Sequence, residues 1–413
     1  MEFLTKYKKI LLVIGFILVV FVLGYLLYAL FFKSLAPSDP AISPVSTTTP
    51  SGGLPTSSAG GNKGTVINEG GTLTDPNQKV EPGASEIANG GVTKTYDLTK
   101  SESIGATLDG KGSMIQYYDK DQGKFFRIDN EGNVSELSDK IFHQIKNVVW
   151  SPNKNKAILE YPDGAKIIYD FSNNKQVTLP SHWKDFSFSP AGDKIVMKSM
   201  GEDPNNRWLA IVSEDGSKAM GVEELGDKDS TVYPMWSPNN QMVAMFTEGK
   251  DFDRQEVYFV GLNKENFKST IVEGRGFVPK WAPTGDRLLY SVYSTQNELK
   301  PSLWIVDAEG DNIGNNRKRL NIETWADKCS FADSKTLYCA VPQKLEEGAG
   351  LFPELAKNTV DDLYRIDTQT GSKKKIAIPE NNLTISNIIP SGDGRYLYFN
   401  DQATGRLHKI NLK

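Results

Sequence analysis

A short motif recurs through the C-terminal part of the chain: an aromatic residue, Ser or Ala, Pro, a polar turn and then an apolar strand. Such a repeat constrains the fold strongly, because each copy must bury its apolar face against a neighbouring copy. Successive copies lie about 38 to 48 residues apart, close to the length of one four-stranded propeller blade. The clear copies are Trp150-Ser151-Pro152, Phe188-Ser189-Pro190, Trp236-Ser237-Pro238 and Trp281-Ala282-Pro283.

Three weaker copies bring the set to seven. They lie at Ala106 to Ile115, at Cys329 to Tyr338, which aligns with the Trp281 copy without a gap, and at Pro390 to Tyr398. Between the motifs, alternating apolar and polar residues end at Gly, Asp or Asn, which is typical of strands joined by tight turns. No apolar pattern of helical period is long enough for a core helix. The sequence therefore predicts an all-β fold, a seven-bladed β-propeller over residues 92–413 with about 46 residues per blade.

The Trp-Ser-Pro unit, with its polar turn and strand, resembles the WD40-like propeller repeats of the TolB family, which also occur in prolyl oligopeptidase-type enzymes. The resemblance covers residues 92–413 and implies the fold far more than a function. The oligopeptidase-type relatives owe their activity to an α/β-hydrolase domain, which is not expected in this sequence. The partners of TolB itself are not carried over, because a membrane anchor and a stalk are predicted in place of its cleaved signal and N-terminal domain.

The two ends of the propeller region complement each other. The last copy supplies only three strands, the third within residues 405–412. A further strand is available at Val92 to Leu98, before the first copy. Because uncovered strand edges invite aggregation, we expect the N-terminal strand to pair with the last one and close the ring.

An apolar segment without charge, Ile10 to Phe32, precedes the propeller region. As a helix with a rise of about 1.5 Å per residue, it would span the roughly 30 Å hydrocarbon core of a membrane. Residues 1–33 are thus predicted to form a cytoplasmic N-terminus and a transmembrane signal-anchor helix, with a cleaved signal peptide as the alternative. Because Lys6, Lys8 and Lys9 precede the segment, the propeller is expected outside the cell membrane.

Residues 34–91 form a second zone, rich in Gly, Ser, Thr and Pro and free of aromatic residues. Such a composition cannot bury enough apolar surface to offset the entropy of ordering the chain. We expect a disordered, flexible stalk, with a linker of no particular role as the alternative.

Several kinds of chemistry are excluded or receive no support. The net charge of −4, with Lys and Arg mostly scattered, argues against nucleic-acid binding. Two cysteines and three histidines, none of the latter close together in sequence, provide no metal signature, and no cofactor is indicated. A Gly-x-Ser-x-Gly elbow is absent and no carboxylate pair stands out, so no catalytic residue is assigned and a non-enzymatic protein is predicted.

Long loops gather on one face of the predicted ring. They connect the second and third strands of four blades, at 199–206, 247–256, 293–300 and 342–357, and share their face with the connections between blades. The longest loop and the blade connections carry apolar or aromatic side chains, which either pack locally or await a partner. The candidate partner-binding residues are Phe142, His182, Trp183, Tyr233, Phe277, Trp325, Leu351, Phe352 and Leu355.

The function predicted from these features is binding of an envelope or surface protein through the long-loop face. One alternative is a glycan- or peptide-binding module that uses the aromatic mouth of the channel. Another is a hydrolase that uses loop carboxylates.

Cys329 and Cys339 flank one predicted hairpin, and a disulfide between them is considered. Directly opposite residues of an antiparallel pair are close enough for a bridge. Opposition requires an odd number of loop residues, such as a three-residue loop at 333–335. The alternative is a pair of buried thiols, with Cys329 in place of the packing Trp of its blade.

Overall fold

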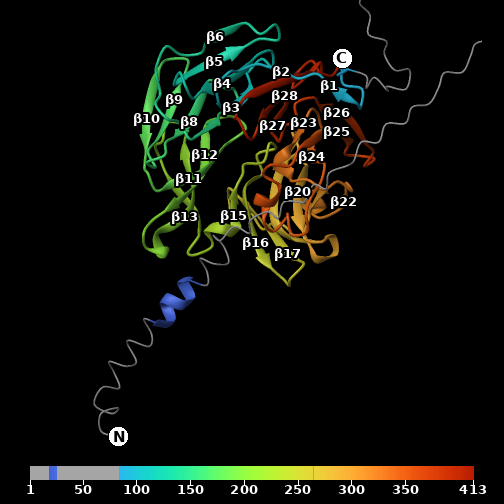
Figure 1. The fold of residues 1–413 in the computed structure, drawn as a ribbon. Helices are drawn as coiled ribbons and strands as arrows, with labels where there is room; N and C mark the ends of the chain where they lie inside the picture. Colours follow the sequence, from blue (N-terminus) through green and yellow to red (C-terminus); the bar gives the residue numbers. More distant parts are fainter. Residues whose placement is uncertain (1–17, 26–82, 264) are drawn as a thin grey trace, which may run out of the picture. The chain divides into compact units, whose positions relative to one another are not determined.

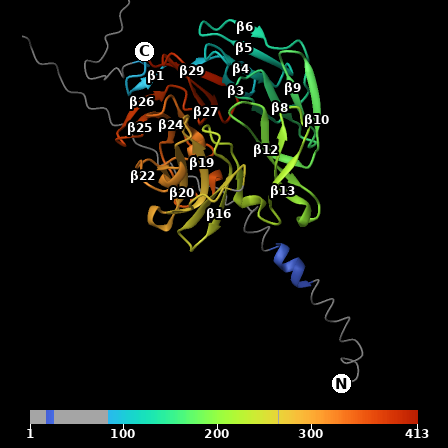
Figure 2. The same ribbon diagram turned by 180° about the vertical axis from the view of Figure 1, so that it is seen from behind.

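Strands β1 to β29 build seven sheets that follow one another around a common axis (Figures 1 and 2). The computed structural model describes residues 18–25, 83–263 and 265–413. Two units are distinguished, Met1–Gln78 and Lys79–Lys413, and all the strands of the described residues belong to the second. The predicted seven-bladed, all-β propeller is confirmed.

Each blade is an antiparallel meander of consecutive strands. The first strands of most neighbouring blades contact one another and therefore lie around the axis. The strands of blades 1 to 3 are β3 (Ser103–Leu108), β4 (Ile115–Asp119), β5 (Lys124–Ile128) and β6 (Val134–Glu136); β7 (Asn147–Trp150), β8 (Lys156–Glu160), β9 (Lys166–Asp170) and β10 (Lys175–Leu179); β11 (Trp183–Phe188), β12 (Lys194–Met200), β13 (Arg207–Ser213) and β14 (Met220–Glu224).

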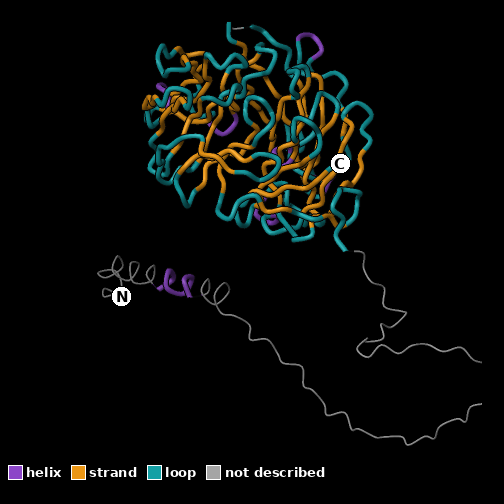
Figure 3. The backbone as a smooth tube through the Cα atoms, turned by 90° about the horizontal axis from the view of Figure 1, so that it is seen from above, coloured by secondary structure: helices purple, strands orange, loops and turns teal. Residues whose placement is uncertain are grey.

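The other blades follow the same plan. Their strands are β15 (Val232–Pro234), β16 (Met242–Gly249), β17 (Gln255–Gly261) and β18 (Thr270–Val272); β19 (Arg275–Trp281), β20 (Arg287–Tyr293), β21 (Pro301–Asp307) and β22 (Lys318–Arg319); β23 (Cys329–Phe331), β24 (Thr336–Pro342), β25 (Asp361–Asp367) and β26 (Lys373–Pro379); β27 (Ile385–Pro390), β28 (Tyr396–Asp401) and β29 (Leu407–Asn411). The connections contain short 3-10 helices (Figure 3): η1 (Pro204–Asn206), η2 (Asp229–Thr231), η3 (Thr295–Asn297), η4 (Gly310–Asn312), η5 (Ala326–Lys328) and η6 (Pro353–Ala356).

The repeated motif ends the first strand of a blade and forms the turn to the second. Its Ser hydroxyl accepts a hydrogen bond from the backbone N–H of the residue that opens the second strand, which closes the turn. These bonds join Ser151 to Lys156 (3.2 Å), Ser189 to Lys194 (3.1 Å), Ser237 to Met242 (2.9 Å) and Ser391 to Tyr396 (2.9 Å). The motif is therefore a turn-forming unit.

The motif tryptophans pack between blades. Trp236 and Trp281 are 5% and 8% exposed and belong to the apolar clusters that fill the space between neighbouring sheets. The Trp281 indole N–H also donates to the carbonyl of Met235 in the preceding blade (3.3 Å). Burial of these large rings helps to hold neighbouring sheets together.

Two separate strands, β1 (Val92–Thr93) and β2 (Tyr96–Asp97), come from the expected closing segment. Strand β2 pairs antiparallel with β29 and completes blade 7, which confirms the predicted closure. Strand β1 instead pairs in parallel with β26 and adds a fifth strand to blade 6. The pairing switches at Thr95, whose N–H donates to the Glu380 carboxylate (2.9 Å), so the segment joins two blades instead of one.

The closing strand carries a titratable pair. His408 is 5% exposed, and its Nδ1 lies 3.0 Å from an Asp97 oxygen. Burial lowers the pKa of His408, although the carboxylates of Asp97 and Asp401 oppose this effect and Arg406 adds to it. The folded protein therefore resists protonation of His408 more than the unfolded chain does, so folding stability should fall as the pH drops below the ordinary histidine pKa of about 6.5.

Replacing His408 by Phe should reduce this acid sensitivity. The Phe ring keeps the stacking on Phe399 but cannot take up a proton. We expect the difference in free energy of unfolding between pH 7.5 and pH 5.5, from urea titrations, to be smaller for His408→Phe than for the unaltered protein. The exposed His143 provides the control, and His143→Phe should leave that difference unchanged. Equal pH dependence in all three proteins would contradict the prediction.

The prediction for the N-terminal segment is corrected. Within the predicted span the structure describes residues 18–25, which are helical. No helix in the described part of the chain is long and apolar enough to cross a membrane. The predicted transmembrane helix is therefore not supported, and the predicted single-pass placement in the cell membrane, with a cytoplasmic N-terminus, is contradicted. The rest of the predicted span, residues 10–17 and 26–32, lies outside the described residues.

The end of the predicted stalk belongs to the propeller. Backbone hydrogen bonds join Ala88 to Asn411 (2.8 Å) and Gly90 to Ile376 (2.7 Å). Residues 85–91 thus lie against blades 6 and 7, because these bonds satisfy backbone groups at the edges of both sheets. Residues 34–82 of the predicted stalk lie outside the described residues.

Candidate functional site

Irregular strand starts line the mouth of the channel on the long-loop face. The first strands of blades 1, 3, 5 and 7 each carry a register shift near their start. One residue in each shift has a positive φ: Gly105 (63°), Asp185 (55°), Gly276 (65°) and Asn387 (48°). Gly, Asp and Asn are the residues that adopt this left-handed conformation most readily. Such bulges redirect neighbouring side chains, so they shape the mouth.

A cavity of about 710 Å³, called here the mouth pocket, lies among the strand starts and loops of blades 4 to 7. Aromatic side chains form much of its wall, together with the loop between β24 and β25 and with polar residues of blade 7. The residues that define it are Tyr233, Phe277, Tyr293, Trp325, Leu351, Pro353, Ser386, Asn387 and Gln402, with the charged residues Asp327, Lys328 and Lys357. An apolar cavity with a few polar groups suits an organic ligand or a peptide side chain.

The structure brings four of the predicted partner-binding residues to this pocket: Tyr233, Phe277, Trp325 and Leu351. Phe352 and Leu355 are 59% and 48% exposed on the same loop. They lie within or next to η6, whose Pro353 lines the pocket. Apolar side chains therefore continue from the pocket onto the exposed loop.

The remaining predicted residues lie elsewhere. Phe142 is 2% exposed and packs edge-on against Phe125 and Tyr169, with ring centroids 5.4 Å and 4.8 Å away. Trp183 is 7% exposed and packs in the core between blades 2 and 3. Both rings are thus packed within the propeller, and neither lines the mouth pocket. His182 is exposed but is not part of the mouth pocket.

A buried ion pair lies beside the pocket and was not foreseen. The Lys328 ammonium contacts both oxygens of Asp361, at 2.8 Å and 2.6 Å, and the Asp361 side chain is fully buried. Asp361 also accepts a hydrogen bond from the backbone N–H of Ile385 (2.6 Å). Burial raises the pKa of Asp361, while Lys328 opposes that shift. Lys328 and Ile385 both line the pocket, and both are bound to Asp361. The ion pair therefore fixes two walls of the pocket relative to each other.

Neighbouring long loops are joined to one another. The Thr295 N–H donates to Asp253 (2.8 Å), which links the loops of blades 4 and 5. The backbone N–H groups of Gly348 and Gly350 donate to Glu298 (2.8 Å) and Leu299 (2.7 Å), which links the loops of blades 5 and 6. The wall formed by the blade 6 loop is therefore held by backbone contacts and does not depend on a ligand for its position.

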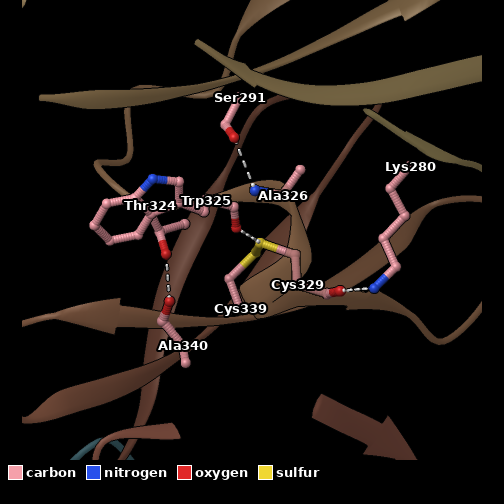
Figure 4. Close-up of a disulfide and its surroundings, with 8 residues drawn as sticks. All are labelled: Lys280, Ser291, Thr324, Trp325, Ala326, Cys329, Cys339 and Ala340. Atoms are coloured by element: carbon pink, nitrogen blue, oxygen red, sulfur yellow. Dashed lines mark hydrogen bonds between the residues drawn. A yellow bond between two sulfur atoms is a disulfide. The ribbon is translucent and has the colours of Figure 1, made fainter. Parts of the chain in front are cut away.

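Trp325 occupies a firmly held connection (Figure 4). The Thr324 hydroxyl donates to the Ala340 carbonyl (2.6 Å), and the Ala326 N–H donates to the Ser291 hydroxyl (3.1 Å). Both residues that flank Trp325 are thus hydrogen-bonded in the core, one to blade 6 and one to blade 5. The indole is presented to the pocket from a rigid base.

Cys329 and Cys339 form a disulfide behind this connection, with an S–S distance of 2.10 Å (Figure 4). They lie directly opposite each other on β23 and β24, and both are fully buried. The gap-free alignment of this blade with the Trp281 copy is wrong: Phe331 opposite Leu337, not Cys329, takes the position of Trp281 opposite Leu288. The hairpin turn is one residue shorter, and this brings the two sulfurs to the same face.

Metal ligands do not gather in the described part of the chain. Over residues 18–25, 83–263 and 265–413, no group of three or more His, Cys, Asp or Glu side chains could hold a metal ion. The mouth pocket presents aromatic, amide, hydroxyl and charged groups to a ligand.

Comparisons with known proteins show the fold alone. No protein-family model matches the chain, and no curated protein does. Among solved structures, an oligogalacturonate lyase in complex with manganese is similar with a TM-score of 0.55 and 14% identity, over 77% of this chain and 93% of that chain. The β-propeller domain of Cps50 (Swd1) from Myceliophteria thermophila is similar with a TM-score of 0.51 and 14% identity, over 77% of this chain and 100% of that chain. Both are propellers, which supports the architecture at an identity too low to transfer an activity.

Proposed function

We propose that this protein is a non-catalytic binding module that holds a segment of another protein in the mouth pocket. The observation that carries the proposal is the continuity between the pocket and the exposed loop: Leu351 lines the pocket, and Phe352 and Leu355 are exposed beside it. Exposed apolar side chains around a preformed cavity are typical of surfaces that bind a protein partner. We also propose that the repeats are of the TolB type, on the strength of their Trp-Ser-Pro turns.

The lining of the pocket favours binding over hydrolysis. Glycoside hydrolysis ordinarily needs a pair of carboxyl groups on either side of the scissile bond. Among the described residues that line the pocket, Asp327 is the one carboxylate. Asp361, close by, is committed to Lys328 and to the Ile385 N–H.

A peptide selection tests the proposal. The protein would be screened against a displayed library of linear peptides about twelve residues long, which extend to about 40 Å. We expect enriched peptides to carry a large apolar residue and to lose at least about tenfold in affinity for Trp325→Ala, because a central aromatic anchor contributes most of such binding. Thermal melting would check that the variant is folded.

The control variant is Val134→Ala, which alters an exposed apolar residue on β6, far along the sequence from the pocket. It should bind the selected peptides normally. Failure to enrich any peptide, or peptides that bind Trp325→Ala as well as the unaltered protein, would contradict the proposal. Trp325-dependent binding of an oligosaccharide in a glycan array, without peptide binding, would favour a glycan-binding module instead.

A further inference from the structure

A second cavity adjoins the mouth pocket on the side of blade 7. This inner pocket, of about 610 Å³, is bounded by β3, β7 and the neighbouring ends of β27 and β28. It shares Ser386, Asn387 and Gln402 with the mouth pocket. The two cavities are therefore separated by no more than the side chains of one shared wall.

The shared wall differs chemically from the aromatic mouth. Its side chains carry one hydroxyl and two carboxamides, groups that pair with the N–H and C=O groups of a peptide backbone. Asn387 uses its amide nitrogen to hold Ala106 of blade 1 (3.0 Å) and thus stiffens the wall. Gln402 is exposed, and within the described residues its carboxamide makes no hydrogen bond, so it is available to a ligand.

Among the described residues that line the inner pocket, Lys154 provides the one ammonium group. It comes from the turn between β7 and β8, and it is half-buried. Among the described residues its ammonium has no hydrogen-bond or ion-pair partner, whereas Lys198 and Lys328, on the long-loop face, are paired with carboxylates. Burial lowers the pKa of Lys154, and no neighbouring carboxylate counteracts that effect.

The carboxylate that also lines this pocket is already engaged. Asp401 accepts hydrogen bonds from the Thr404 N–H (3.0 Å) and hydroxyl (2.7 Å), within its own turn. It lies beyond ion-pair distance of Lys154. A partly desolvated cation without a counter-ion is costly, and a ligand anion would remove that cost.

We propose that the mouth pocket and the inner pocket form one groove, which holds an extended peptide with an apolar side chain in the mouth pocket and a carboxylate against Lys154. The peptide backbone crosses the shared wall at Gln402. This inference rests on the proposed function and specifies its ligand as an acidic, apolar segment. Aromatic residues alone would accept any apolar peptide, and Lys154 restricts the choice.

The test uses the peptides selected on the unaltered protein, or the library itself. We expect an Asp, a Glu or the free C-terminal carboxylate at a constant distance from the apolar residue. The variant Lys154→Asn should bind these peptides with about tenfold lower affinity, the usual effect of losing a charge-assisted hydrogen bond. Asn is chosen because Lys154 has a φ of 60°, a conformation that Asn tolerates. Neutralising the peptide carboxylate should lower the affinity for the unaltered protein by the same factor. It should not lower the affinity for Lys154→Asn any further.

A matched control is available at Lys218, which has a φ of 55° and is exposed on the turn before β14. Lys218→Asn should bind normally, and Lys154→Arg, which keeps the charge, should bind within a few-fold of the unaltered protein. The groove would be overturned by selected peptides that lack a constant acidic group, or by peptides that bind Lys154→Asn as tightly as the unaltered protein. In either case, weaker binding to Trp325→Ala would still support the proposed function. Loss of all peptide binding from the selection would overturn both.

Discussion

Deleting residues 92–98 should destabilise the propeller by at least about 5 kcal/mol, the largest effect that we expect from a change outside the core. The deletion removes β1 and β2 together and so exposes the edge of β26 in blade 6 and of β29 in blade 7. It also removes the buried Thr93 and the bond from the Leu98 N–H to the Leu407 carbonyl (2.8 Å). Chemical denaturation followed by tryptophan fluorescence would measure the loss.

The control for this prediction is a deletion of equal length at residues 51–57, outside the described part of the chain. It should leave the midpoint of denaturation unchanged. A ring that depends on its closing segment should also aggregate when that segment is missing, because two strand edges become free to pair. Similar midpoints for both deletions would show that residues 92–98 do not hold the ring closed.

Replacing Lys328 by Met should destabilise the protein by about 3 to 5 kcal/mol, because it leaves the Asp361 carboxylate buried without a cation. The double variant Lys328→Met/Asp361→Leu should recover most of this loss, since it removes both charges together. The defect of the single variant should also shrink as the pH falls, because protonated Asp361 no longer needs a counter-ion.

This prediction has a second consequence, for the pocket. Lys328 belongs to the connection that carries Trp325, and Asp361 holds Ile385 of blade 7. The double variant should therefore be stable yet bind peptides less tightly than the unaltered protein, because the two walls are no longer tied. Equal stability of Lys328→Met and the unaltered protein at neutral pH would contradict the role given to the pair.

The helix interpretation of residues 10–32 shows a limit of reasoning from a single local pattern. An apolar run without charge satisfies the length requirement of a transmembrane helix, but no helix in the described part of the chain is long and apolar enough to cross a membrane. Similarly, the boundary at residue 92 followed composition, while residues 85–91 are held by backbone hydrogen bonds that composition does not reveal.

The sequence by itself determined the architecture of this propeller. The spacing of the Trp-Ser-Pro units sets the number of blades, because each unit encodes one turn and one packing residue through local hydrogen bonds and burial. It also indicated which face carries the long loops and that a segment near residue 96 closes the ring.

Only the tertiary structure decided which of the exposed-looking residues share a site. Phe142 and Trp325 occupy comparable connections, yet the first is packed between Phe125 and Tyr169 and the second lines a cavity. The pairing of Lys328 with Asp361, and the absence of such a partner for Lys154 among the described residues, likewise depend on how neighbouring blades meet. Local patterns encode strands and turns, whereas contacts between blades join residues far apart in the chain, and no periodicity records them.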